Sequence, residues 1–212
     1  MNAIDRDLQE LYGRLGEIHL LRGISGLLDW DQQVCMPDTA QAFRVEQRTY
    51  LARRIHALLT DREFETVLFR LRDCVEQLSD VDSVNVRETV RSHEHRSKLP
   101  VDFVAERAAA RAEAYGIWRD ARQADDFSAA RPALERNVEL AQREADLIGY
   151  SDSPYDPLLD DFEPGMTLSE LQPLFKKLGE ELGKLVPRIR DLVESWGVSE
   201  QQQYLYPLDQ QQ

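Results

Sequence analysis

Residues 1–21 read MNAIDRDLQELYGRLGEIHLL, and this stretch indicates the fold class of the whole chain. Its apolar residues recur at steps of three and four, at Ile4, Leu8, Leu11, Leu15 and Ile18. Steps of that size place side chains on one face of an α-helix. The pattern continues to Trp30 and predicts a long first helix. That helix should end before Pro37, because proline lacks an N–H and its ring clashes with the preceding turn.

The same spacing recurs along the rest of the chain. It predicts further helices over residues 39–59, 64–78, 82–96, 101–124, 132–148 and 168–196. The valines of residues 82–96 also favour a strand, but the neighbouring Arg, Glu and His residues favour a helix. Short turns between helices are typical of an antiparallel array. We therefore expect an all-α fold of about seven antiparallel helices, forming a single domain over residues 1–212.

Several helix boundaries have local signals of their own. Thr60 and Thr167 each precede a glutamate by three residues, which is typical of a capping box at a helix start. In the last predicted helix Pro187 should produce a kink, and Gly197 should end the helix.

One long stretch, residues 151–165, lacks helical spacing and reads SDSPYDPLLDDFEPG. Its apolar content is too high for a disordered linker, and its three prolines lower the entropy lost on ordering. We expect this stretch to be ordered, with Leu158, Leu159 and Phe162 inserted between helices. Some of its carboxylates should cap helix ends or pair with arginines.

The net charge of the chain disfavours some classes of binding partner. The formal net charge is −13, which disfavours nucleic acids and anionic lipid surfaces, and no stretch resembles a basic groove. Only Lys98, Lys176, Lys177 and Lys184 are lysines, and the other basic residues are arginines. An acidic surface poor in lysine suits a high-salt cytoplasm and also occurs in ordinary proteins, so both origins stay open.

Cysteine usage and hydropathy bear on location. Cys35 and Cys74 lie far apart and form no CxxC pair, as expected of reduced thiols in the cytosol. The N-terminus lacks the basic start and apolar run of a signal peptide. No stretch approaches the ~18 uncharged apolar residues that span a bilayer. The sequence predicts a cytoplasmic protein without membrane segments.

Residues that carry chemistry are scarce. None of the four histidines lies in a GxSxG-like or Cys-plus-His context. His93 and His95 are two apart, so on a helix they point to nearly opposite faces and cannot share one ion. The zincin motif HExxH, whose histidines are four apart, is absent from the 212 residues. We therefore predict no catalytic residue, metal ligand or cofactor in this chain.

Residues 144–175 hold eight carboxylates and no lysine or arginine. Two interpretations are open: a cation site or substrate-groove rim, or carboxylates gathered at turns and helix N-termini. The tryptophan of the first helix, Trp30, is by physical chemistry alone most simply a core residue.

Three stretches together resemble one known family. The first is LDWDQQVCMP at residues 28–37, followed by Arg44 and Gln47 in an RxxQ pattern. The second begins at Leu99-Pro100, continues through WRDAR at residues 118–122, and includes Asp126-Phe127 and the Pro132–Leu134 segment. The third, YDPLLDDFEPGMT at residues 155–167, is similar to YDxLLDxYEPGMT, with phenylalanine at 162 where tyrosine is common. Their order and spacing resemble the carboxypeptidase Taq family of zinc metallocarboxypeptidases over nearly the whole chain.

This resemblance implies a mostly helical fold with a deep groove, a homodimer, and release of single residues from peptide C-termini. It implies zinc in the full-length enzyme, held by HExxH and a downstream glutamate. HExxH and the HPF and DxRxT motifs that precede it in the family would follow Gln212, and residues 206–210 resemble the approach to that part. The chain would then be the N-terminal portion, with its partners being the absent catalytic half and, in the complete enzyme, a peptide.

The resemblance marks eight groove or structural candidates: Trp30, Asp31, Arg44, Gln47, Tyr155, Asp156, Asp160 and Glu163. Two hypotheses follow for the chain as a whole. It is the groove-forming N-terminal region of a carboxypeptidase, without activity when alone, or it is a stand-alone helical module from a truncated or split gene that binds a partner and does no chemistry.

Overall fold

The computed structural model describes residues 2–195, and within that range every regular element is helical. In chain order the elements are α1 (Ala3–Val34), the 3₁₀-helix η1 (Asp38–Ala40), α2 (Gln41–Leu59), α3 (Arg62–Asp73), the 3₁₀-helix η2 (Val75–Gln77), α4 (Asp80–Ser97), α5 (Val101–Gln123), α6 (Phe127–Ile148), α7 (Asp156–Leu159) and α8 (Leu168–Ser195). The all-α prediction is confirmed, with seven long helices and the one-turn α7 in the described part of the chain.

The chain divides into two compact units, the first ending at Pro157 and the second beginning at Leu158. The first unit holds α1 to α6, the boundary falls inside α7, and α8 belongs to the second unit. A single domain over residues 1–212 therefore stays a prediction. None of the helices among residues 2–195 combines the length and the apolar character needed to cross a membrane.

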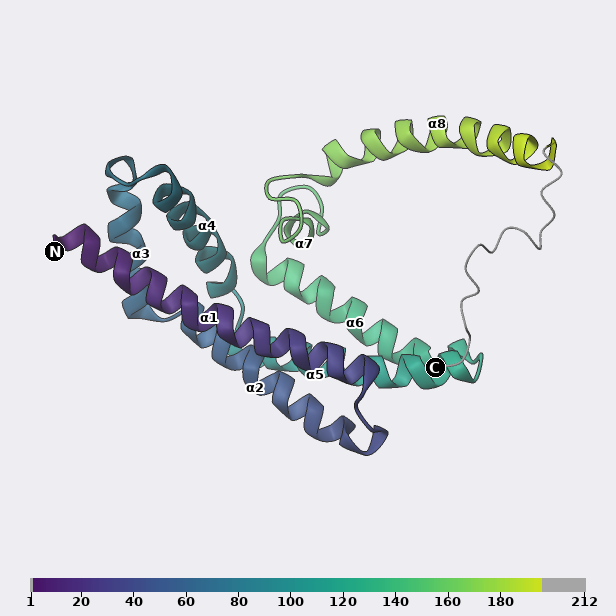
Figure 1. Ribbon diagram of the computed structural model, residues 1–212, viewed down its shortest axis with the longest axis horizontal. Helices are drawn as coiled ribbons and strands as arrows, with labels where there is room; N and C mark the ends of the chain where they lie inside the picture. Colours follow the sequence, from purple (N-terminus) through teal and green to yellow (C-terminus); the bar gives the residue numbers. More distant parts are fainter. Residues whose placement is uncertain (1, 196–212) are drawn as a thin grey trace. The chain divides into compact units, whose positions relative to one another are not determined.

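Within the first unit the helices lie alongside one another (Figure 1). α2 packs between α1 and α5, and α6 packs along the other side of α5. α3 and α4 form a pair that packs near the N-terminal end of α1. The short connections at residues 35–40 and 124–126 reverse the chain direction, as expected of an antiparallel array.

Three apolar clusters hold these helices together. Leu11 of α1 is fully buried against α3 and α4, in a cluster completed by Phe64, Val67, Leu68, Leu71, Val86 and Val90. Ile18 joins α1 to the end of α2 through Leu58 and Leu59. Phe103 and Leu140 join α5 to α6. Burial of this apolar surface provides the main stabilising free energy of the unit.

Two helix starts differ from the predictions. Asp61, and not Thr60, caps α3, because its carboxylate accepts the N–H of Phe64, while the Thr60 hydroxyl donates to the carbonyl of His56. The sixth helix starts at Phe127, not near Pro132, because the Asp126 carboxylate accepts the N–H groups of the next turn. In both cases an aspartate, which is among the strongest N-caps, sets the boundary.

The helix predicted over residues 64–78 is interrupted: α3 ends at Asp73, and the 3₁₀-helix η2 (Val75–Gln77) follows it. The later boundaries are closer to the predictions. Residues 82–96 lie within α4 and form no strand. At the start of α8 the Glu170 carboxylate accepts the N–H of Thr167, which is half of the predicted capping box. α8 continues through Pro187 as one helix, and Gly197 lies outside the described residues.

The stretch between α6 and α8 is closed by local hydrogen bonds. The Asp160 carboxylate accepts the N–H of Gly165, whose φ of +79° is one that glycine adopts without strain. Leu159 is only 8% exposed and Leu158 is half-buried. Phe162 is 82% exposed, so its predicted insertion between helices is wrong. Its backbone N–H donates to the Leu159 carbonyl, so the chain turns directly after α7.

Candidate functional site

Arg44 is the centre of a polar cluster between α1 and α2. The residue is 7% exposed, and its guanidinium donates to three groups. These are the backbone carbonyl of Leu28, the carboxylate of Asp31 and, at 3.0 Å from Nε, the side-chain oxygen of Gln47. A buried guanidinium needs such partners, because an unpaired buried charge is costly. Arg44 therefore contacts two of the other candidate residues, Asp31 and Gln47.

Two glutamines extend this cluster to α5. Gln32 Nε2 donates to the backbone carbonyl of Ala112 at 3.1 Å, and Gln41 Nε2 donates to the same oxygen at 2.8 Å. A Cβ on Gly116, one turn further along α5, would lie 3.3 Å from Gln41 Nε2. Glycine at that position therefore allows the amide to approach closely.

Arg48 completes the cluster. It donates to Gln32 Oε1 at 3.1 Å and pairs with the Asp29 carboxylate at 2.6 Å. Residues of the WDQ and RxxQ motifs thus connect α1, α2 and α5 through hydrogen bonds. Several of these bonds involve charged groups, and such hydrogen bonds are stronger than those between neutral groups. This arrangement positions helices and contains no nucleophile or acid–base pair.

Trp30, from the same motif, is not part of the core. The side chain is 55% exposed, so the simple core interpretation is wrong. The remaining candidates lie in the 155–167 stretch and fall on both sides of the unit boundary. Tyr155 is half exposed and precedes α7, which begins at Asp156. Asp160 closes the turn at Gly165, and Glu163 is exposed. The turn role of Asp160 fits the interpretation that carboxylates here serve local structure.

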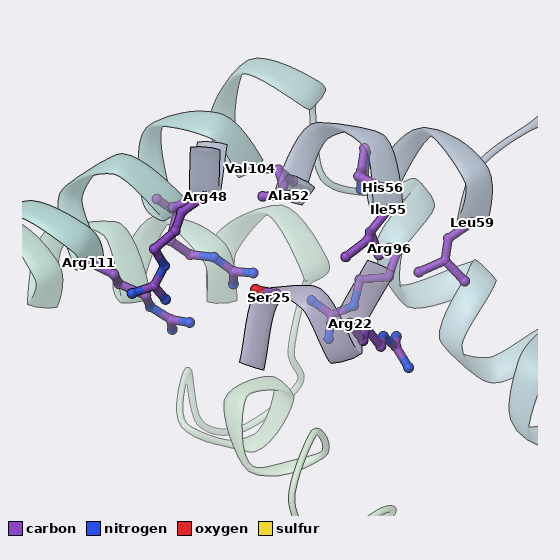
Figure 2. A pocket seen from close by; sticks show the side chains of 12 residues that line it. Arg22, Ser25, Arg48, Ala52, Ile55, His56, Leu59, Arg96, Val104 and Arg111 are labelled. Carbon is purple, nitrogen blue, oxygen red and sulfur yellow. The ribbon is translucent and has the colours of Figure 1, made fainter. Parts of the chain in front are cut away.

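A pocket of about 380 Å³ lies within the first unit, beside the polar cluster. It is lined by residues of α1, α2, α4 and α5. Five arginines take part: Arg22, Arg48, Arg96, Arg107 and Arg111. Figure 2 shows Arg48 and Arg111 on one side of Ser25, with Arg22 and Arg96 on the other. A pocket of this size is not a groove for nucleic acid, so the expectation that the chain has no basic groove stays a prediction.

The charge of the pocket acts on the histidine in its wall. His56 is buried, and this burial lowers the pKa of its imidazole below the ordinary 6.5. A hydrogen bond with the Leu99 backbone opposes that change, and the positive charges of Arg96 and Arg107 add to the lowering. The neutral imidazole is thus favoured next to a cluster of guanidinium groups.

Enzymes of the carboxypeptidase Taq family that this chain resembles hold zinc through side chains of the protein. Among residues 2–195 no group of three or more His, Cys, Asp and Glu side chains is placed to hold a metal ion. His93 is buried, with Nδ1 at 2.6 Å from the Leu59 carbonyl and Nε2 at 3.3 Å from the Ser97 hydroxyl. The contact with Leu59 ties α4 to α2, and the two contacts together occupy both ring nitrogens. The described side chains therefore do not fit that zinc.

Sequence reasoning found the Asp31–Arg44–Gln47 group only through motif resemblance, and it missed the arginine pocket. A partial signal existed, because Arg107 and Arg111 are four residues apart and share a helical face. The meeting of four helices, whose lining residues lie between positions 22 and 111, cannot be predicted from local sequence patterns.

Comparison with known proteins gives a consistent result. The sequence model described as "Carboxypeptidase Taq (M32) metallopeptidase" matches residues 10–212. Thermostable carboxypeptidase 1 of Thermus thermophilus is 34% identical over 185 residues, covering 82% of this chain and 36% of that protein. Carboxypeptidase 1 of Bacillus subtilis is 28% identical over 181 residues, covering 85% of this chain and 36% of that protein.

Comparison with solved structures leads to the same family. The crystal structure of the protein named BsuCP superposes with a TM-score of 0.83 at 28% identity, covering 87% of this chain and 37% of that one. A Pyrococcus furiosus carboxypeptidase superposes with a TM-score of 0.74 at 27% identity, covering 91% and 38%. The chain thus spans little more than a third of the relatives it matches. With a family match over almost its full length, this chain belongs to the carboxypeptidase Taq (M32) metallopeptidase family.

Proposed function

We propose that this chain supplies the N-terminal helical part of a metal-dependent carboxypeptidase that releases C-terminal residues from peptides. The observation that carries the proposal is the family match over residues 10–212 in a chain that covers about 36% of its relatives. The 212 residues contain no HExxH. Zinc ligands and the general base would therefore come from sequence that follows the matched stretch in longer family members.

In this proposal the residues of the first unit have a scaffold role. The Asp31–Arg44–Gln47 group and the two glutamines bound to Ala112 keep α1, α2 and α5 in register. A register fixed by buried, charge-assisted hydrogen bonds suits a wall that must hold its shape beside a substrate groove. Exposed Trp30 and Tyr155 are the candidates for contact with peptide.

The deciding experiment begins with the reading frame after Gln212. Where it continues into HExxH, the chain and the continuing part are expressed separately and together, with zinc, and release of C-terminal residues from a peptide is measured. We expect activity from the pair and none from either polypeptide alone. A matched control replaces the glutamate of HExxH with glutamine and should abolish activity without weakening association. Release of C-terminal residues by the 212-residue chain alone would contradict the proposal that catalysis needs the continuing part.

A second candidate is a stand-alone helical module that binds a partner. The observation that favours it is α8, which buries none of its residues and carries a row of exposed leucines: Leu174, Leu178, Leu182, Leu185 and Leu192. Exposed apolar rows of this kind mark association surfaces. A stop codon directly after Gln212, with no catalytic part encoded nearby, would favour this function over the first.

A further inference from the structure

The apolar residues of α8 include a set whose spacing alternates strictly between four and three positions. We call this set the α8 seam, and it consists of Leu171, Phe175, Leu178, Leu182, Leu185, Ile189 and Leu192. All of them lie on one helix of 28 residues, which Figure 1 draws without a break, and none of them is buried. An apolar repeat of 3.5 residues over three heptads is typical of a helix that packs lengthwise against another helix.

The face of α8 opposite the seam suits contact with water. Pro173 and Pro187 are fourteen positions apart and share that face. Each proline deprives one carbonyl of the preceding turn of its intrahelical donor, and on this face water can satisfy it. Three of the four lysines of the chain lie on the same side: Lys176, Lys177 and Lys184. The helix therefore has one side for water and one apolar side, which Leu174 and Val186 widen.

Two exposed residues of opposite charge border the seam and indicate what covers it. Glu181 and Arg188 are seven positions apart, and each directly precedes a residue of the seam. In a parallel pair of identical helices, Glu181 would face Val186 and Arg188 would face Val193. In an antiparallel pair this flanking position faces its counterpart, so Glu181 meets Arg188 of the second copy, and the two-fold axis produces that contact twice. Charges beside an apolar seam set the choice of partner and its direction, and these two favour an antiparallel copy.

The apolar layers agree with the register that the charges select. With Glu181 opposite Arg188, the seam forms three kinds of layer across the pair: Leu182 on Leu185, Leu178 on Ile189, and Phe175 on Leu192. In the single chain Glu181 pairs with Lys184 of the same helix at 2.7 Å, and both side chains are more than 60% exposed. Exposed pairs of this kind contribute little free energy, so the carboxylate can turn to a new partner.

We propose that the α8 seam is covered by α8 of a second copy of this chain, in antiparallel orientation, with Glu181 of each copy against Arg188 of the other. The contact is isologous, since the same surface of both copies takes part. This inference goes beyond both functions proposed above. Its test measures association and not peptide release, so its failure is distinguishable from theirs.

The test is sedimentation equilibrium of the 212-residue chain at low ionic strength, where ion pairs are least screened. We expect a reversible equilibrium between monomer and dimer. In Glu181→Arg like charges would meet twice per dimer, and the dissociation constant should rise by about five-fold or more, although the chain becomes less negative. In Glu181→Arg/Arg188→Glu the charges are exchanged and the net charge is that of the parent, so the dissociation constant should return to within about two-fold of the parent value.

The matched control is Glu180→Arg, which makes the same change of charge at the neighbouring exposed position, on the face of α8 away from the seam. It should associate at least as tightly as the parent, because a less negative chain repels its copy less. Circular dichroism checks that all variants stay helical. A parent that is monomeric at every concentration would mean that another partner covers the seam and would overturn the proposal. Equal weakening in Glu180→Arg and Glu181→Arg, or no recovery in the double variant, would overturn it as well.

Discussion

The guanidinium of Arg44 on α2 holds the carboxylate of Asp31 on α1 across the turn that joins the two helices. The same guanidinium donates to the Leu28 carbonyl and to Gln47, so one side chain links the end of α1 to the start of α2. This contact explains in physical terms why the WDQ and RxxQ patterns occur together, as two halves of one hydrogen-bonded group.

Replacing Arg44 should therefore destabilise the first unit. In Arg44→Ala the Leu28 carbonyl, Asp31 and Gln47 lose their donor, and we expect a loss of about 2–4 kcal/mol in the free energy of unfolding. Urea denaturation followed by circular dichroism measures it. Arg44→Lys should recover only part, because an ammonium lacks the planar fork. Arg53→Ala, at an exposed position of the same helix, serves as control and should change stability by less than about 0.5 kcal/mol.

Two apolar residues of the 158–162 stretch should respond in opposite ways. Leu159 is 8% exposed, so Leu159→Ala should cost about 2–5 kcal/mol from lost burial and the cavity left behind. Phe162 is 82% exposed, and Phe162→Ala should change stability by less than about 0.5 kcal/mol. Thermal and urea unfolding of both variants measures the contrast. Equal effects would show that the two side chains have been assigned the wrong environments.

Stability should also depend on pH through His56. Burial lowers the pKa of this imidazole below its unfolded value of 6.5, so the unfolded chain binds the proton more readily. The contribution of His56 is complete above pH 6.5 and is lost as the pH falls from there toward the lower folded pKa. We expect His56→Gln to flatten the pH dependence of the free energy of unfolding in that window. His19→Gln, at an exposed position of α1, should keep the slope of the parent.

The 212-residue chain should hold no stoichiometric zinc. No three-ligand group exists among residues 2–195, and the sequence lacks HExxH. A bound structural zinc would add to the folding free energy, and its removal would lower the melting temperature. Since we expect no bound zinc, a chelator should leave the melting temperature unchanged. Plasma mass spectrometry after dialysis measures the content. About one tightly held zinc ion per chain would contradict this prediction.

The apolar row on α8 should promote self-association of the chain. Leu178 and Leu185 are each nearly half exposed and lie seven residues apart, on one helical face. Leu178→Gln/Leu185→Gln should shift the protein toward monomer in sedimentation velocity, because less apolar surface is gained by association. Lys177→Gln/Glu180→Gln, which changes exposed polar positions without altering net charge, should sediment like the parent. If the unaltered chain stays monomeric at high concentration, the prediction is wrong.

The sequence by itself determined the helical class, most helix bounds and the family. Those features depend on residues close in the chain: apolar side chains every three or four positions, prolines that end helices, and motifs read in order. Even so, local signals misplaced two helix starts: Asp61 caps α3 in place of Thr60, and Asp126 caps α6 ahead of the expected start near Pro132.

The tertiary structure alone decided which distant residues meet. The Asp31–Arg44 pair lies thirteen positions apart, and Gln32 reaches Ala112 across eighty. The exposure of Trp30 and Phe162 depended on how helices pack and turns close, which side-chain type does not encode. The five pocket arginines come from four helices, so their grouping in space could not be predicted from their positions in the sequence. Helical periodicity acts over one or two turns, whereas a pocket is made by the packing of whole helices against one another.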